Sequence, residues 1–130
     1  MIKNYYYFIV GILFILSSFS LVWRGQSSFL PITNASDFDL ASKTTILYVW
    51  HIITVENLIF GVAFIVMSVY KDIEKVKFTA WLIAAIIVAR WAVIFCSTLF
   101  KNENGVTDTL TESLVLLVFV GLIILGTRKK

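Results

Sequence analysis

The sequence predicts an all-α fold, an integral membrane antiparallel four-helix bundle with both termini on the cytoplasmic side. The composition is the first reason: of 130 residues, 59% are hydrophobic and 15% are charged, which is rare in a soluble domain. The second reason is that four apolar runs are each long enough for a helix that crosses a bilayer, which takes about 20 residues. The third is an unequal distribution of lysine and arginine between the connections on the two sides.

The four runs define the expected helices and leave no room for a second domain. Residues 1–130 are therefore expected to form one transmembrane domain, with helices at about 5–23, 45–70, 78–100 and 110–127. The range 24–44 remains as a long outer loop that contains Pro31 and Asp37. Connections of this length without structure of their own are uncommon. The loop is either a lid or a plain segment folded onto the bundle, and the sequence leaves both open.

The first helix, residues 5–23, is bounded by aromatic residues that also fix its place in the membrane. Tyr5, Tyr6 and Tyr7 begin it and Trp23 ends it. Tyrosine and tryptophan concentrate where a membrane meets water, so they support both boundaries.

Lysine and arginine residues give the orientation. Seven lie on the side of the termini, namely Lys3, Lys71, Lys75, Lys77, Arg128, Lys129 and Lys130, and three lie on the other side, namely Arg24, Lys43 and Lys101. Because positive residues remain in the cytoplasm, both termini are expected there. The net charge of +3 is thus a topology signal, and nucleic acid is not an expected partner.

The second helix, residues 45–70, has two polar faces. One face combines small and polar residues that suit close helix contact, namely Trp50, Thr54, Asn57, Gly61, Phe64 and Ser68. Glu56 lies about 100° away from Asn57 on the next face. Two neighbours are therefore expected, one for the amide and one for the carboxylate. His51 is the only histidine, and we expect it between these faces, at the outer mouth of the bundle.

The third helix, residues 78–100, carries Arg90 near mid-membrane. A charge at this depth costs roughly 2.5–3.5 kcal/mol unless it is paired or hydrated. Glu56 has the opposite sign and a matching depth, so an ion pair between Glu56 and Arg90 is predicted. The pair either orients the helices or belongs to an outward-open polar cavity that binds a ligand or carries protons; contacts within an oligomer are a third possibility.

Glu112 lies early in the fourth helix, residues 110–127. Thr109 and Glu112 match a capping box at the beginning of a helix. The alternative is that Glu112 acts as a second carboxylate for Arg90.

Catalytic residues and a metal site are not predicted, and no cofactor is indicated. The sequence has no Ser-His-Asp arrangement, Gly-rich phosphate loop or Cys-x-x-Cys motif, and only His51 could activate a nucleophile. An enzyme is therefore the less favoured class. One histidine excludes bis-histidine haem ligation within a chain, although two chains could share a haem. His51 and Glu56 are about 140° apart on a helix, which is unsuited to one metal ion.

Short motifs in three of the expected helices resemble a known family. "ENLIFGVAF" in the second helix, "ARW" followed by a serine in the third and "TES" at the start of the fourth resemble the DoxX-like and BphX-like small bacterial membrane proteins. The resemblance implies four helices in a bacterial cytoplasmic (inner) membrane, and it places the family's arginine and glutamate at Arg90 and Glu112. It also implies an accessory role near redox or aromatic-degradation systems.

Three functions remain open for this chain within its lipid bilayer. The first is a non-enzymatic accessory or subunit of a membrane assembly, or an oligomer of the chain itself. The second is a binder or carrier of a small lipophilic or anionic molecule, in a polar interior formed by His51, Glu56, Asn57, Arg90 and Glu112. The third is a quinone-linked redox accessory, in which His51 or Arg90 would hydrogen-bond a carbonyl.

Overall fold

The computed structural model of the chain describes residues 1–101 and 106–128, and all regular structure in these residues is helical. Four helical segments are long and apolar enough to cross a membrane, namely Tyr5–Ala35, Leu40–Val69, Ile73–Phe100 and Thr109–Arg128. The predicted all-α class is confirmed. Four such helices are typical of a small multi-pass membrane protein.

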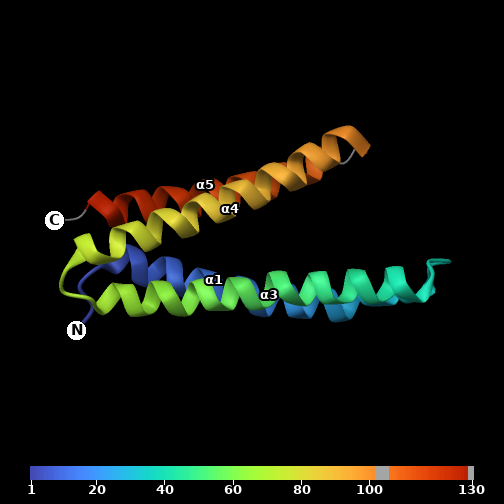
Figure 1. Cartoon of the computed structure of the whole chain (residues 1–130), viewed down its shortest axis with the longest axis horizontal. Helices are drawn as coiled ribbons and strands as arrows, with labels where there is room; N and C mark the ends of the chain where they lie inside the picture. The colour runs from blue at the N-terminus through green and yellow to red at the C-terminus, as the bar shows by residue number, and fades with distance from the viewer. Residues whose placement is uncertain (102–105, 129–130) are drawn as a thin grey trace.

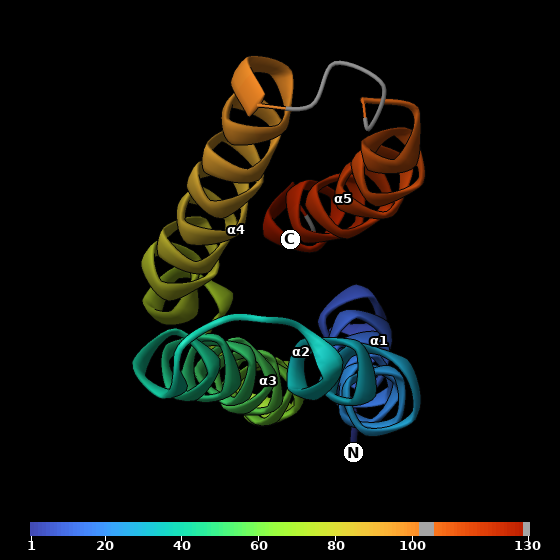
Figure 2. The same ribbon diagram turned by 90° about the vertical axis from the view of Figure 1, so that its right-hand side faces the viewer.

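The long helices are arranged as two pairs. One pair consists of α1 (Tyr5–Arg24) and α3 (Leu40–Val69), and the other of α4 (Ile73–Lys101) and α5 (Val106–Arg128). Both chain ends lie at the same end of the molecule, which we call the termini end (Figure 1). The two pairs lie close together there and diverge toward the opposite, distal end, which faces the viewer in Figure 2.

The outer loop expected over residues 24–44 is wrong, because most of this range is helical. α1 continues into a π-helical turn, η1 (Gly25–Phe29), and then into α2 (Leu30–Ala35). Only residues 36–39 separate α2 from α3. Residues 24–44 therefore form neither a lid nor a long loop. Two other helices begin earlier than expected, since α4 begins five residues before position 78 and α5 four residues before position 110.

The π-helical turn explains how helix and proline coexist in this range. Pro31 lacks a backbone N–H and would interrupt the ordinary ladder of hydrogen bonds. It lies in the first turn of α2, where a proline is tolerated. The N–H of Leu30 donates to the carbonyl of Gly25, five residues earlier. The proline therefore marks a change of helical winding and not a loop.

α1 and α3 pack closely because two glycines face each other. A Cβ atom on Gly11 would lie 2.9 Å from the Gly61 carbonyl oxygen, and a Cβ atom on Gly61 would lie 2.9 Å from the Gly11 carbonyl oxygen. The Ser18 hydroxyl also donates to the Thr54 carbonyl at 2.9 Å. The predicted small and polar face of α3 is buried, with Thr54, Asn57, Gly61, Phe64 and Ser68 among the buried residues of the helix. That prediction is confirmed.

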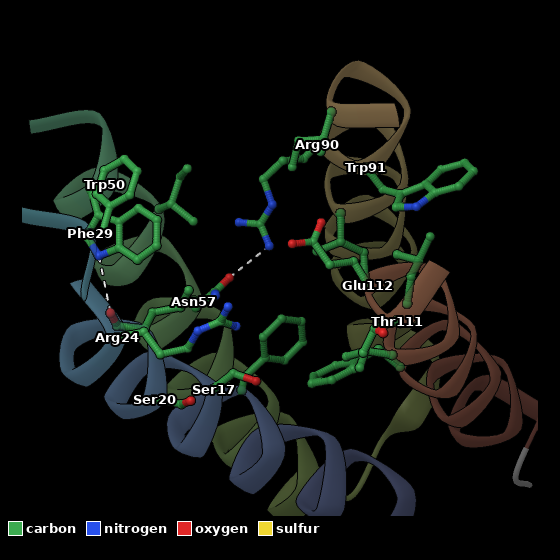
Figure 3. Close-up of a pocket in the computed structure, with 18 residues that line it drawn as sticks. Ser17, Ser20, Arg24, Phe29, Trp50, Asn57, Arg90, Trp91, Thr111 and Glu112 are labelled. Atoms are coloured by element: carbon green, nitrogen blue, oxygen red, sulfur yellow. Dashed lines mark hydrogen bonds between the residues drawn. The ribbon is translucent and has the colours of Figure 1, made fainter. Parts of the chain in front are cut away.

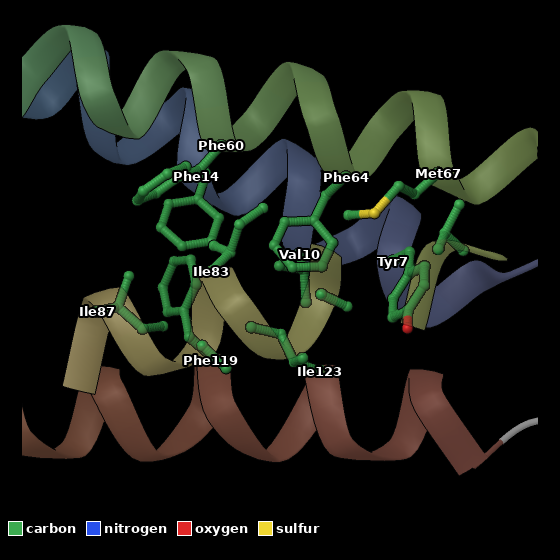
Figure 4. Close-up of a cluster of buried hydrophobic side chains, with 13 residues drawn as sticks. Tyr7, Val10, Phe14, Phe60, Phe64, Met67, Ile83, Ile87, Phe119 and Ile123 are labelled. Atoms are coloured by element: carbon green, nitrogen blue, oxygen red, sulfur yellow. The ribbon is translucent and has the colours of Figure 1, made fainter. Parts of the chain in front are cut away.

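A hydrophobic core fills the space between the helix pairs toward the termini end (Figure 4). The four long helices all contribute to it, with the labelled residues Tyr7, Val10, Phe14, Phe60, Phe64, Met67, Ile83, Ile87, Phe119 and Ile123. Phe14 lies at its centre, with ring centroids 4.4 Å from Phe119 and 5.8 Å from Phe60. The core therefore holds α1, α3 and α5 together by edge-to-face aromatic contacts.

Hydrogen bonds tie the termini end together. Asn4 is fully buried; its side-chain oxygen accepts from the Tyr7 N–H and its amide donates to the Gly126 carbonyl at 2.9 Å. The backbone N–H groups of Lys3 and Asn4 both donate to the Ser68 carbonyl. One short segment thus links α1, α3 and α5.

The outward faces of the helices are apolar. Large exposed side chains occur on every long helix, for example Phe19, Ile59, Val93 and Leu117. In a bilayer such side chains contact lipid, so their exposure carries no unfavourable free energy of hydration. A soluble protein rarely exposes so many large apolar side chains.

Candidate functional site

A cavity of about 660 Å³ lies between the two helix pairs, in the distal half of the molecule. Its lining is largely apolar and aromatic, with Phe14, Leu21, Phe29, Trp50, Ile87 and Phe119 among the residues that contact it. Polar side chains enter it from all four long helices, namely Ser17, Ser20, Arg24, Asn57, Arg90, Thr111 and Glu112 (Figure 3). The cavity therefore has an apolar body with a small number of convergent polar groups.

Arg90 provides the best-defined polar contacts of this cavity. Its Nη1 atom donates to Glu56 Oε2 at 3.0 Å, and its Nη2 atom donates to Asn57 Oδ1 at 3.0 Å. Figure 3 shows the hydrogen bond between Arg90 and Asn57 as a dashed line. Asn57 is 5% exposed, and the Arg90 and Glu56 side chains are 27% and 32% exposed. The predicted ion pair between Glu56 and Arg90 is confirmed.

Local helix geometry explains why one guanidinium reaches two side chains. Glu56 and Asn57 are consecutive on α3, so their side chains diverge by about 100°. The planar fork of an arginine places two donors side by side, and here each donor meets one of them. The two expected neighbours of α3 are present, since its small and polar face packs on α1 and its carboxylate meets α4. The Asn57 amide was expected to be served by one neighbour and the carboxylate by the other; this part is wrong, because Arg90 of α4 binds both.

Glu112 lines the cavity but does not cap α5. The helix begins at Val106, six residues earlier, so the capping-box interpretation is wrong. In the described part of the chain, no ion pair joins Glu112 to Arg90. Its carboxylate is directed into the cavity (Figure 3). Glu56, and not Glu112, is therefore the carboxylate partner of Arg90.

His51 is not brought to the cavity. Its ring is exposed, and Nδ1 lies 2.8 Å from the Leu47 carbonyl of its own helix. It lies in a shallow groove on another face of α3, together with Tyr48, Ile52 and Glu56. Six residues separate His51 from Asn57, which is about 120° around the helix. The expected ring of five polar residues is thus incomplete, with Asn57, Arg90 and Glu112 lining the cavity itself.

The sequence reasoning missed the contribution of α1. Ser17, Ser20 and Arg24 line the cavity, and their spacings of three and four residues place them on one helix face. That spacing was readable from the sequence, but ending the first helix at residue 23 left Arg24 in a loop. The side chain of Arg24 makes no hydrogen bond or ion pair with another described residue, and Figure 3 shows its guanidinium directed into the cavity.

Aromatic contacts hold the distal rim of the cavity. Trp50 Nε1 donates to the Leu21 carbonyl at 3.2 Å, and its ring stacks on Phe29 with a centroid separation of 4.6 Å. A Cβ atom on Gly25 would collide with the Trp50 indole, so only glycine leaves room for it. These contacts fasten the π-helical turn onto α3.

A second tryptophan supports the wall formed by α4 and α5. Trp91 Nε1 donates to Ser113 Oγ at 2.9 Å, and the Ser113 hydroxyl donates to the Thr109 carbonyl at 2.8 Å. Trp91 also stacks on Phe95. The two helices that carry Arg90 and Glu112 are therefore joined next to the cavity.

Within residues 1–101 and 106–128, no three histidine, cysteine, aspartate or glutamate side chains lie close enough to hold a metal ion. No family model matches the chain, and neither a curated protein nor a solved structure shows significant similarity to it.

Proposed function

We propose that this chain is a small membrane protein that binds an amphipathic molecule in the cavity between its two helix pairs. The observation that carries the proposal is the combination of about 660 Å³ of space, a largely apolar wall and a few converging polar groups. Ligand pockets typically have volumes of about 300–1,000 Å³ and this kind of lining. The apolar body of the ligand would lie against Phe14 and Phe119, and its polar group would lie near Arg24, Arg90 and Glu112.

The membrane setting is part of the same proposal. Residues 1–130 would form a single antiparallel four-helix bundle in a bacterial cytoplasmic membrane, as in DoxX-like proteins, with both termini in the cytoplasm. The distribution of basic residues supports this orientation. The cavity, which lies away from the termini end, would then be reached from the outer side.

The contact of Arg90 with Glu56 and Asn57 gives the cavity a fixed polar wall. Because two of the donors of Arg90 are engaged, its guanidinium is held in place before a ligand arrives. A preorganised polar group loses less conformational entropy on binding. Its remaining N–H groups are available for a phosphate, a carboxylate or a carbonyl oxygen of a quinone-like ligand.

An accessory role in a membrane assembly is the second candidate, and the exposure of α4 favours it. Side chains such as Phe78, Val93 and Phe100 are at least two-thirds exposed. This surface would contact either lipid or another membrane helix, including that of a second copy of the chain. Binding of a ligand and attachment to a partner are compatible in one small protein.

A cavity-filling variant tests the proposed binding. We expect an amphipathic molecule to be extracted from the purified protein and identified by mass spectrometry. Ser17→Trp places a large side chain into the cavity and should abolish this co-purification. Val62→Trp is the matched control, because Val62 lies on the exposed face of α3 at 51% exposure and outside the cavity lining. Equal amounts of the molecule in both variants, or none in the unsubstituted protein, would contradict the proposal.

A further inference from the structure

We infer that the ligand of this cavity is a zwitterion, whose anionic group binds Arg24 and whose ammonium group binds Glu112. The inference rests on the proposed function and names the chemistry of the ligand's polar group. Its starting point is the charge of the cavity wall. Among the described residues that line the cavity, Arg24, Arg90 and Glu112 have acidic or basic side chains, and Arg90 is already paired with Glu56.

Arg24 and Glu112 are left with opposite charges on opposite walls. Arg24 enters from α1 and Glu112 from α5, and both side chains are directed into the cavity (Figure 3). Neither side chain makes a hydrogen bond or an ion pair with another residue that the structure describes, and no ion pair joins them to each other. Two opposite charges held apart in a partly apolar space form complementary sites for two opposite charges of one ligand.

A ligand with a single charge fits this arrangement less well. An anion bound to Arg24 would be repelled by Glu112, and a cation bound to Glu112 would be repelled by Arg24. A zwitterion pairs both side chains and leaves no charge uncompensated. The chemistry of the two groups agrees: guanidinium binds phosphate or carboxylate with two parallel hydrogen bonds, and a carboxylate accepts from the N–H donors of an ammonium group that face it.

The same zwitterionic group occurs in two kinds of molecule. It occurs on lipids, as a phosphoethanolamine headgroup, and on small water-soluble compounds that lack an acyl chain. The same cavity that holds Arg24 and Glu112 also has an apolar wall, which includes Phe14, Leu116 and Phe119. This wall would hold a hydrocarbon chain. The experiment below distinguishes the two sources.

Binding to a matched set of amphiphiles tests the inference. The probes are lysophosphatidylethanolamine, lysophosphatidic acid, an alkylamine and a monoacylglycerol with equal hydrocarbon chains, together with glycerophosphoethanolamine, which has no chain. Binding to the full chain in a non-ionic detergent is measured by tryptophan fluorescence, since Trp50 and Trp91 line the cavity, and by native mass spectrometry. We expect the lysophosphatidylethanolamine to bind at least about ten-fold tighter than the other amphiphiles, which corresponds to about 1.4 kcal/mol.

Three variants assign the charges. Arg24→Gln should weaken lysophosphatidylethanolamine binding about ten-fold and remove its advantage over the alkylamine, because the anion site is lost. Glu112→Gln should remove the advantage over lysophosphatidic acid. Both side chains are exposed, so these changes are compatible with folding. Lys75→Gln, a change in an exposed ion pair with Asp72, is the control and should leave all affinities unchanged.

The outcomes separate this inference from the proposed function. Absence of binding for every probe that carries a chain would overturn the proposed function. Equal binding of the four amphiphiles, a preference for the anion or the amine, or unchanged preferences in Arg24→Gln and Glu112→Gln would overturn the zwitterion and leave cavity binding intact. Equal binding of glycerophosphoethanolamine and the lysolipid would support the zwitterion, identify a water-soluble ligand and overturn the amphipathic character given to the ligand in the proposed function.

Discussion

Arg90 of α4 and Glu56 of α3 are joined across the space between the two helix pairs by a hydrogen-bonded ion pair of 3.0 Å. The same guanidinium binds Asn57, so a single side chain of α4 engages two consecutive positions of α3. α3 and α4 otherwise belong to different helix pairs that diverge toward the distal end (Figure 1). This contact therefore sets the separation of the pairs beside the cavity.

The first prediction concerns the coupling of these two residues. Glu56→Gln and Arg90→Met should each lower the free energy of unfolding by about 1–3 kcal/mol. Losses of about 3–5 kcal/mol are typical when one partner of a fully buried pair is removed, but these side chains are 27% and 32% exposed. The double variant should lose less than the sum of the single losses, by about 0.5–3 kcal/mol. The measurement is thermal or denaturant unfolding in detergent. Strictly additive losses would show that the pair does not contribute to stability.

The second prediction compares two glycines. Gly11→Ala places a Cβ atom 2.9 Å from the Gly61 carbonyl oxygen and 2.9 Å from the Ile65 backbone nitrogen, which are rigid backbone atoms. α1 and α3 must then separate, at an expected cost of about 1–3 kcal/mol. Gly121→Ala is the matched control, because nothing lies within 4 Å of the added atom. It should be neutral or stabilising by up to about 1 kcal/mol, since alanine favours helix. Equal stabilities of the two variants would argue against the close packing of α1 on α3.

The third prediction concerns Tyr7, which is fully buried although its hydroxyl has no hydrogen-bond partner among the described residues. A buried polar group without a partner costs about 1–3 kcal/mol. Tyr7→Phe removes the hydroxyl, keeps the ring that contacts Phe64 at 5.4 Å, and should raise the unfolding temperature. Tyr6→Phe, at a position that is 37% exposed, should leave it unchanged. A clear loss of stability in Tyr7→Phe would reveal a partner for the hydroxyl.

The fourth prediction concerns access to the cavity. In a Cys96→Ser background, Arg24→Cys and Glu112→Cys should react with a membrane-impermeant maleimide that is added outside intact cells. Val62→Cys should remain unlabelled, since its position on the exposed apolar face of α3 would contact lipid. Labelling of Arg24→Cys and Glu112→Cys only after the cytoplasmic side is opened would reverse the proposed orientation.

The sequence by itself was sufficient for the features that depend on local pattern. The apolar runs predicted four helices, and the helical periodicity of α3 predicted its buried face with Thr54, Asn57 and Gly61. The matching depths of Glu56 and Arg90 predicted their ion pair. Each follows from the fixed rise and rotation per residue of an α-helix, which operate within one segment. The outer loop was wrong for the same local reason, because a π-helical turn before Pro31 keeps the chain helical.

The tertiary structure decided which side chains meet in the cavity. It placed His51 on another face of α3, joined Arg90 to both Glu56 and Asn57, and brought Arg24 of α1 and Glu112 of α5 into one cavity. These choices depend on the distance and rotation of one helix relative to another. The distance and rotation between helices are set by the backbone contact of Gly11 with Gly61 and by the aromatic contacts of Phe14. Such contacts join segments that are far apart in the chain, so no local periodicity encodes them.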